Sequence, residues 1–198
     1  VVISDMQTLM SLPDRELKAG LAEIIKHGAI KDEGFFIWLE QNVERILARE
    51  PEALSHAVFR SCEIKGAIVV NDERELGERA LLNFGHTFGH AIENGMGYGM
   101  WLHGEAVSAG MALASELSAQ MGMLDQSAVL RIRNLLNRAG LPVEVKGISA
   151  TKLRELMSLD KKAKDGKLRF ILLERIGRAG IRSDVGAGAL ERTLASIA

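Results

Sequence analysis

A mainly α, multihelical domain is the fold that the sequence predicts, with a short β-hairpin and an N-terminal strand stub. Apolar residues recur at helical spacing over most of the chain, and glycine or proline separates the periodic segments. Strand-like runs are confined to two short stretches. With 198 residues, 47% of them hydrophobic, the chain is long enough for one sizeable core, so we expect a single domain over residues 1–198.

The individual elements follow from local patterns. Residues 1–5, VVISD, read as the end of a buried strand with nothing visible to pair with it, which suggests a sheet upstream. Pro13 suits a first helical turn, and the apolar stripe after it predicts a helix over about residues 13–30. Two apolar runs around the glycines of residues 167–185 predict a hairpin. Further amphipathic helices are predicted at residues 33–48, 51–70, 83–95, 103–122, 125–139 and 187–198.

Composition and charge limit the classes of function. A formal net charge of -1 and the lack of a dense lysine or arginine run argue against nucleic acid or an anionic membrane as a partner. No apolar run approaches the roughly 20 residues that span a bilayer. The single cysteine, Cys62, cannot form an internal disulfide and reads as a small buried residue of a cytoplasmic protein. We expect small molecules as partners.

Residues 83–105 carry the most informative motif, NFGHTFGHAIENGMGYGMWLHGE. On a helix, His86 and His90 are four residues apart and share a face, so both can reach one metal ion. Thr87 occupies the place where a zinc protease of the HExxH type carries its glutamate, which argues against peptide hydrolysis. A glycine-rich loop then turns the chain, so that His103 could face the earlier pair.

A metal site of this kind needs a further ligand, and Glu23 is a candidate. It lies on an otherwise apolar helix face, in LAEIIKHG, where an unpaired carboxylate would be costly to bury. Lys26, one turn further on, offers a local ion pair as the alternative explanation. A histidine pair at this spacing can equally be hydrogen-bonded structure. Spacing alone therefore leaves the metal-binding and the structural interpretations open.

Three long segments carry a family resemblance. They are LKAGLAEIIKHGAI (17–30), CEIKGAIVVNDERELGERALLNFGHTFGHAIE (62–93) and GYGMWLHGEAVSAGM (97–111). Together they closely resemble 3-dehydroquinate synthase, and the similarity covers nearly the whole chain. The chain resembles the C-terminal, mainly helical half of that family. This half carries the metal site and much of the substrate pocket, so the resemblance implies a metal- and substrate-binding domain.

The resemblance implies roles for particular residues. The family's metal ligands, which hold Zn2+ or Co2+, match Glu23, His86 and His103. Family residues that bind the substrate's carboxylate, hydroxyls and phosphate match Lys26, Lys65, Arg79, Asn83, and Lys161 or Lys162. Proton transfer is implied for His90 and Glu75. Contacts with NAD are implied around Thr8 and Ser11.

The activity implied by the resemblance is conversion of 3-deoxy-D-arabino-heptulosonate 7-phosphate to 3-dehydroquinate and phosphate, a lyase step of the shikimate pathway. NAD takes up a hydride and returns it, and the family's enzyme is expected to be a homodimer. The family's N-terminal NAD-binding α/β half has no counterpart in these 198 residues, so we expect the chain alone to bind NAD poorly and to be inactive. The alternatives are another sugar-phosphate cyclase, a metal-dependent polyol dehydrogenase, or a non-enzymatic helical module with a structural metal.

Overall fold

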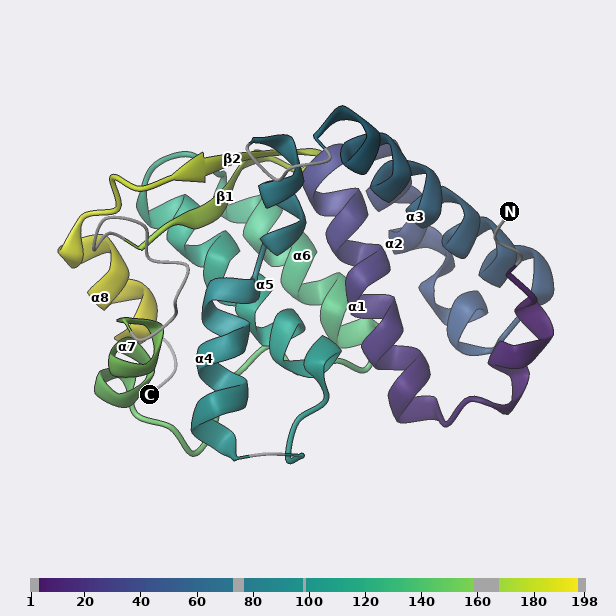
Figure 1. The fold of residues 1–198 in the computed structure, drawn as a ribbon, viewed down its shortest axis with the longest axis horizontal. Helices are drawn as coiled ribbons and strands as arrows, with labels where there is room; N and C mark the ends of the chain where they lie inside the picture. Colours follow the sequence, from purple (N-terminus) through teal and green to yellow (C-terminus); the bar gives the residue numbers. More distant parts are fainter. Residues whose placement is uncertain (1–3, 73–76, 98, 159–167, 196–198) are drawn as a thin grey trace.

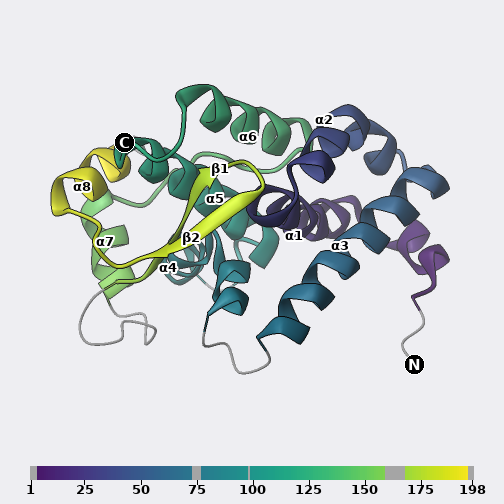
Figure 2. The same cartoon turned by 90° about the horizontal axis from the view of Figure 1, so that it is seen from above.

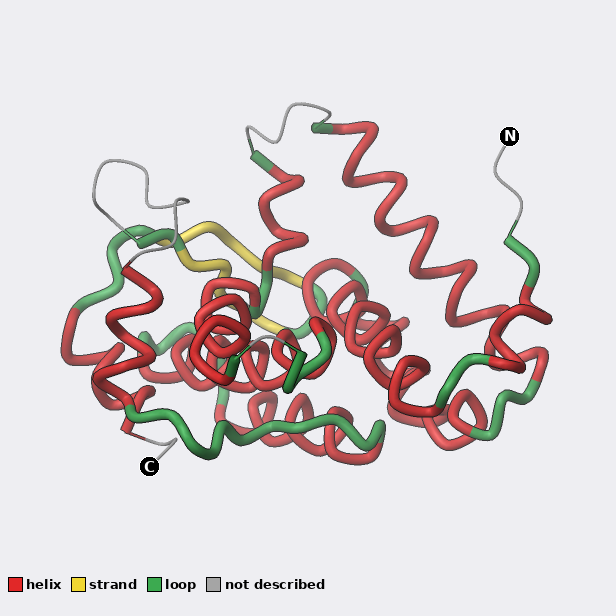
Figure 3. Tube along the Cα trace, turned by 60° about the horizontal axis from the view of Figure 1, so that its bottom comes forward, coloured by secondary structure: helices red, strands yellow, loops and turns green. Residues whose placement is uncertain are grey.

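Most of the chain is helical in the computed structural model, which describes residues 4–72, 77–97, 99–158 and 168–195 (Figures 1 and 3). Two short 3-10 helices are named η, and a two-stranded antiparallel hairpin lies near the C-terminal end. In chain order the elements are η1 (Met6–Ser11), α1 (Asp14–Lys31), α2 (Glu33–Leu47), α3 (Pro51–Asn71), η2 (Glu78–Asn83), α4 (His86–Met96), α5 (His103–Gln120), α6 (Gln126–Arg138), α7 (Ala150–Ser158), β1 (Phe170–Arg175), β2 (Arg178–Arg182) and α8 (Ala187–Ala195).

Helix α5 lies at the centre of the molecule and packs against α1, α4, α6, α8 and β1 (Figure 1). It is buried along nearly its whole length, and many of its residues are alanine, glycine or serine. Small side chains shorten the distance between packed helices, so α5 can have many close neighbours. Its buried hydroxyls have partners: Ser108 Oγ donates to the Pro142 carbonyl at 2.8 Å, and Ser118 Oγ accepts from the Leu173 amide at 3.0 Å.

The hairpin of β1 and β2 crosses over α5 and reaches the end of α1 (Figure 2). Gly177 forms its turn with a φ of 82°, a conformation that favours glycine. The Gly177 amide donates to the Ala29 carbonyl at 2.8 Å, and a Cβ on Gly177 would lie 2.5 Å from the Glu33 amide nitrogen. The hairpin thus satisfies one of the last carbonyls of α1, and only glycine fits at the contact.

The predicted mainly helical fold and its hairpin are confirmed, with differences that have local causes. The helix expected over residues 83–95 begins instead at His86, because Gly85 adopts a left-handed φ of 81° between η2 and α4. Asn83 therefore ends η2 and does not extend the face of α4. Helix α7 is absent from the prediction, although the Ser149 hydroxyl accepts from the Lys152 amide at 3.2 Å as a cap.

Cys62 is exposed on α3, so the prediction that it is buried is wrong. Its neighbour Ser61 is buried, and one step along a helix turns the next side chain by about 100°. The apolar pattern of the sequence predicts that this part of α3 borders the core. It does not decide whether Ser61 or Cys62 faces the core.

The N-terminal strand stub falls mainly on residues 1–3, which lie outside the described residues. Asp5 already belongs to the next element, because its carboxylate accepts from the Gln7 amide at 2.9 Å and caps η1. Within the described ranges, no helix combines the length and the apolarity that crossing a membrane requires.

Candidate metal centre

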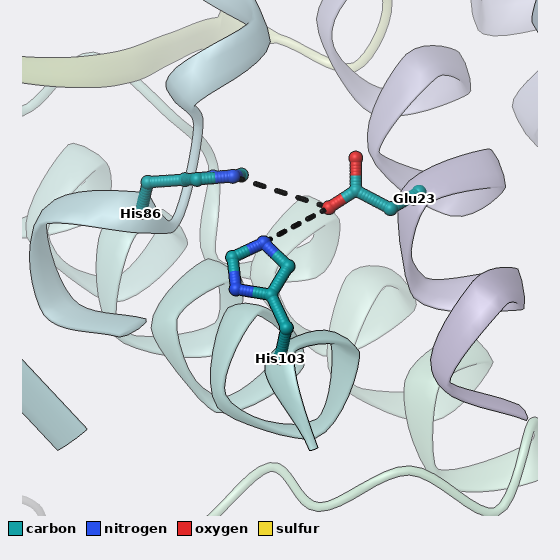
Figure 4. A group of neighbouring side chains, drawn as sticks. All are labelled: Glu23, His86 and His103. Carbon is teal, nitrogen blue, oxygen red and sulfur yellow. Dashed lines mark ion pairs between the residues drawn. The ribbon is translucent and has the colours of Figure 1, made fainter. Parts of the chain in front are cut away.

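Three side chains that are distant in sequence meet where α1, α4 and α5 come together (Figure 4). Glu23 lies in the middle of α1, while His86 and His103 are the first residues of α4 and α5. The Nε2 atoms of His86 and His103 lie 4.0 and 3.8 Å from Glu23 Oε1. Their imidazole rings are 5.1 Å apart between centroids. The loop between α4 and α5 thus returns His103 to face His86, as its glycine spacing suggests.

A glycine contact brings α5 against α1 at this point. A Cβ added to Gly104 would lie 2.0 Å from the Ala19 carbonyl oxygen and 2.6 Å from the Ala19 Cα. Gly104 follows His103 directly, and Ala19 lies one turn before Glu23 on α1. Because no larger residue fits between the two backbones, the contact holds His103 within reach of Glu23.

Glycines also set the crossing of α4 and α5. A Cβ on Gly110 of α5 would lie 2.1 Å from the Gly85 carbonyl oxygen, and one on Gly89 of α4 would lie 3.2 Å from the Ala106 carbonyl oxygen. Gly85 is the residue before His86, so the close crossing fixes the first turn of α4 beside α5. Both histidines are therefore positioned by a backbone contact at an adjacent residue.

Glu23 uses its two carboxylate oxygens differently. Oε2 pairs with the ammonium of Lys26, whose side chain is only 3% exposed. Oε1 is buried and has no hydrogen-bond partner among the described residues, since both imidazole nitrogens are too far away for a hydrogen bond. An unsatisfied buried carboxylate oxygen is costly. The ion pair expected as the alternative for Glu23 therefore exists, but it occupies only one oxygen and leaves the other facing the histidines.

The donor set fits a divalent transition metal. One carboxylate and two imidazoles suit Zn2+ or Co2+, with bonds of about 2.0–2.2 Å. Two donor atoms of a tetrahedral ion with such bonds lie about 3.4 Å apart, near the 3.8 and 4.0 Å separations from Glu23 Oε1. A cation among the three side chains would satisfy the unpartnered oxygen. Three protein ligands would leave a coordination position for a substrate oxygen, the arrangement typical of catalytic sites.

Local electrostatics hold Glu23 and His86 in the protonation states that a bound cation would require. Burial and the nearby Lys26 ammonium lower the pKa of His86 to about 4, so its imidazole is neutral at pH 7. Burial opposes the charged form of Glu23, but Lys26 and the two histidines outweigh it and hold the pKa of that carboxyl below its ordinary value. Neutral imidazole and ionised carboxylate are the forms that bind a cation.

Four of the residues expected to bind substrate lie on α1 or on elements that pack against it. Lys26 is in the ion pair with Glu23, and Lys65 of α3 is near enough to lower the pKa of Lys26, after the larger effect of burial. Arg79 and Asn83 lie on η2, which packs against both α1 and α3. The His90 ring lies 5.4 Å from His86 and 6.1 Å from His103, centroid to centroid. These side chains therefore come from elements that adjoin the metal centre.

Two other groups of predicted site residues have different outcomes. Thr8 and Ser11 lie on η1, which packs against α3 on the opposite side of α1 from α4 (Figures 1 and 2). Their hydroxyls donate to the Asp5 and Thr8 carbonyls of the same segment. The structure does not bring them to Glu23, His86 and His103. Glu75, Lys161 and Lys162 lie outside the described residues.

Glu93 and an arginine fork are part of this neighbourhood and are absent from the predicted site. Glu93 Oε2 lies 3.2 Å from His103 Nδ1. Arg15 donates through Nε and Nη2 to the Glu105 carboxylate at 2.7 Å each, and Glu105 accepts from the Leu102 amide at 2.8 Å. The Glu105 carboxylate thus caps α5 at Leu102, the residue before His103, and Arg15 holds that carboxylate in place. Glu93 lies seven residues after His86, two helical turns away, and that spacing is the signal in the sequence.

Comparison with known proteins gives consistent matches. The family model described as 3-dehydroquinate synthase C-terminal matches residues 20–163. The 3-dehydroquinate synthases of Nitrosospira multiformis and Nitrosomonas europaea are both 55% identical to the chain, over 193 and 196 residues. These alignments cover 98% and 99% of the chain and 53% of each relative. The chain therefore spans about half the length of the curated relatives it matches.

Solved structures with this fold include two synthases. The 2-epi-5-epi-valiolone synthase of Streptomyces hygroscopicus subsp. jinggangensis, with NAD+ and Zn2+ bound, matches with a TM-score of 0.88 and 29% identity over 98% of this chain and 54% of that one. A 2-deoxy-scyllo-inosose synthase matches at a TM-score of 0.83 and 22% identity, over 98% of this chain and 56% of that one. At this identity the match shows a shared fold alone. The family model covers more than half of the chain, and the chain belongs to the 3-dehydroquinate synthase family as its C-terminal part.

Proposed function

We propose that this chain forms the metal- and substrate-binding domain of a 3-dehydroquinate synthase. The enzyme would convert 3-deoxy-D-arabino-heptulosonate 7-phosphate to 3-dehydroquinate and phosphate, in the cytoplasm and as a homodimer. The observation that carries this proposal is the buried, unpartnered Oε1 of Glu23 facing two imidazole nitrogens. Relatives named 3-dehydroquinate synthase, 53–55% identical to the chain, support the choice of reaction.

Glu23, His86 and His103 would hold Zn2+ or Co2+. A bound ion would supply a Lewis acid at a substrate hydroxyl, and NAD would supply the hydride acceptor. Lys26 keeps Glu23 ionised through its ion pair, so the carboxylate stays available as a ligand. His103 is half exposed, whereas His86 is nearly buried, so substrate would approach from the side of His103.

The cations around the centre would bind the anionic groups of the substrate. Lys65 and Arg79 suit its carboxylate and phosphate, with Lys161 or Lys162 as a further contact, and Asn83 suits a hydroxyl. His90, beside both metal-facing histidines, would transfer a proton at the substrate, with Glu75 as the second such group. Departure of phosphate needs both a proton acceptor and cations that stabilise the leaving dianion.

The NAD site would be completed by a part of the protein outside these 198 residues. The valiolone synthase neighbour was solved with NAD+ and Zn2+, and this chain covers 54% of it. We assign to Thr8 and Ser11 a contact at the rim of the cofactor. Both residues lie on η1, the element that precedes α1, and α1 carries Glu23.

Metal analysis of the purified chain tests the proposal. We expect about one Zn2+ per chain, and about a hundredfold weaker binding for Glu23→Gln, because the charged ligand is lost. Glu16→Gln, a change of an exposed carboxylate on the same helix, serves as the control and should keep the affinity. A chain that binds no divalent metal would contradict the proposal.

Activity gives the second arm of this test. The chain mixed with the N-terminal half of the Nitrosospira multiformis relative and NAD should release phosphate from 3-deoxy-D-arabino-heptulosonate 7-phosphate, whereas the chain alone should not. The valiolone synthase neighbour makes a related cyclase the second candidate, because its TM-score is 0.88. A preference for a heptulose phosphate without the carboxylate would favour that candidate.

A further inference from the structure

Glu93 lies on the face of α4 that carries His86 and His90, and it points at the start of α5. Its Oε2 lies 3.2 Å from Nδ1 of His103, the residue that begins α5. The Glu93 side chain is 31% exposed and that of His103 is 50% exposed. Because half of the His103 side chain is exposed, packing alone does not fix the orientation of its ring. The Glu93 carboxylate is a hydrogen-bond partner that can fix it.

The two metal-facing histidines are arranged alike. In each of them Nε2 faces Glu23 Oε1, while Nδ1 lies near an oxygen acceptor. For His86 that acceptor is the Phe84 carbonyl at 3.3 Å, and for His103 it is the Glu93 carboxylate. An imidazole whose Nδ1 proton is donated to an acceptor presents the lone pair of Nε2. Both rings thus present Nε2 toward Glu23 and Nδ1 toward an oxygen acceptor.

The acceptors differ in a way that matches exposure. His86 is 13% exposed, and a neutral backbone carbonyl is enough to orient a ring that the core already confines. His103 has no such confinement and pairs with a charged carboxylate, which forms the stronger hydrogen bond. Partners of this kind behind a metal-binding histidine fix its tautomer and raise its basicity, and losing them weakens metal binding about 10–100-fold.

We propose that Glu93 is the positioning residue of His103, holding the proton on Nδ1 so that Nε2 is free to bind the metal. The inference rests on the proposed function, because it takes Glu23, His86 and His103 as the ligands. Glu93 also forms a second group of potential ligand atoms with His90 and His103, all within 4.8 Å of one another. A second cation there would need Nδ1 of His103 without its proton, so the two arrangements exclude each other.

Zinc affinity, measured by competition with a chromogenic chelator, tests the proposal on the 198-residue chain. We expect Glu93→Ala to weaken zinc binding about 10–100-fold. Glu93→Gln, which keeps an oxygen acceptor but loses the charge, should weaken it less. Asn94→Ala, at the adjacent exposed position of α4, is the matched control and should have the affinity of the unchanged chain. Equal affinities for all three variants would overturn the proposal.

Nitrogen-15 NMR of the His103 ring in the metal-free chain gives a readout that a general loss of structure would not produce. We expect a single tautomer protonated at Nδ1, mixed tautomers in Glu93→Ala, and recovery of the single tautomer in Glu93→Gln. The same tautomer in Glu93→Ala as in the unchanged chain would overturn the proposal. Two zinc ions per chain, one of them lost in Glu93→Ala, would also overturn it, in favour of a second cation site.

These two measurements separate the inference from the proposed function. If the unchanged chain binds no zinc, the proposed function fails, while the tautomer measurement still reports on Glu93. If zinc binds but Glu93 changes neither affinity nor tautomer, the inference fails and the proposed function stands.

Discussion

Burial decides the chemical state of individual residues in α1, and His27 shows this apart from the metal centre. Its side chain is buried, and Nδ1 lies 2.7 Å from the Ser61 hydroxyl. Burial, together with the neighbouring Lys26 ammonium, lowers the pKa of His27 from 6.5 to about 4. Its contact with Ser61 agrees with a structural role.

The lowered pKa of His27 makes stability depend on pH. When the pH falls below 6.5, the pKa of His27 in the unfolded chain, the unfolded chain binds a proton that the folded chain does not bind. Stability is therefore lost as the pH falls from about 6.5 to about 4. We expect His27→Gln to reduce the loss in unfolding free energy between pH 7.5 and pH 5 by about 2 kcal/mol. Urea unfolding in the presence of a chelator measures this. Ser61→Ala, which keeps the buried imidazole, should lower stability at both pH values but retain the slope, and an unchanged slope in His27→Gln would contradict the explanation.

At this scale, the sequence predicts part of the metal centre. Helical spacing places His86 and His90 on one face, and the observed rings are neighbours. No local pattern relates Glu23 to His103, which are joined only by the packing of α1 on α5. The choice of Glu23 therefore depends on family resemblance, and its role as a ligand stays a prediction. The spacing of Glu93 from His86 predicts that both lie on one face of a helix. It does not predict that Glu93 contacts His103, which lies on another helix.

At the scale of elements, glycine is what lets three helices meet at the metal centre. Gly104 faces the Ala19 backbone, and Gly110 faces the Gly85 backbone. Periodicity identified most helices because it reports which face is buried. Periodicity does not indicate how closely two helices approach, because the approach depends on glycines at the contact. The same limit applies to the start of α4, which the backbone of Gly85 determines.

Gly104→Ala should affect stability and metal binding together. The added methyl would lie 2.0 Å from the Ala19 carbonyl oxygen, so α5 must move away from α1. We expect a loss of about 1–3 kcal/mol in the free energy of unfolding and zinc binding weaker by about tenfold or more.

The matched control for this change is Gly20→Ala on α1. A Cβ at Gly20 meets no atom of the described residues within 4 Å. Replacing an exposed helical glycine by alanine should raise stability by about 0.5–1 kcal/mol and leave zinc affinity as it was. Urea unfolding and chelator competition give both quantities. If Gly104→Ala bound zinc normally, the contact of α5 with α1 would not be what positions His103.

At the scale of the whole molecule, Glu23, His86 and His103 belong to helices that share one apolar core. Helices α1 and α4 both pack against α5, and their buried apolar side chains belong to one continuous core. We expect removal of zinc with a chelator to leave the helical circular dichroism signal unchanged. The free energy of unfolding should fall only by the binding contribution, about 4 kcal/mol for zinc at a thousandfold excess over its dissociation constant. Loss of the helical signal would indicate instead a structural metal.

The turn of the hairpin has a consequence for the order in which the chain can fold. Gly177 follows Ala29 by 148 residues in the sequence, and its amide satisfies the Ala29 carbonyl in the last turn of α1. Contacts between such remote segments are slow to form, because a long loop must close first. A ribosome must therefore have released most of the chain before the end of α1 finds its partner. Until then the apolar surface that Leu172 and Leu173 cover stays open to water, and a nascent chain that stops before Phe170 should need a chaperone.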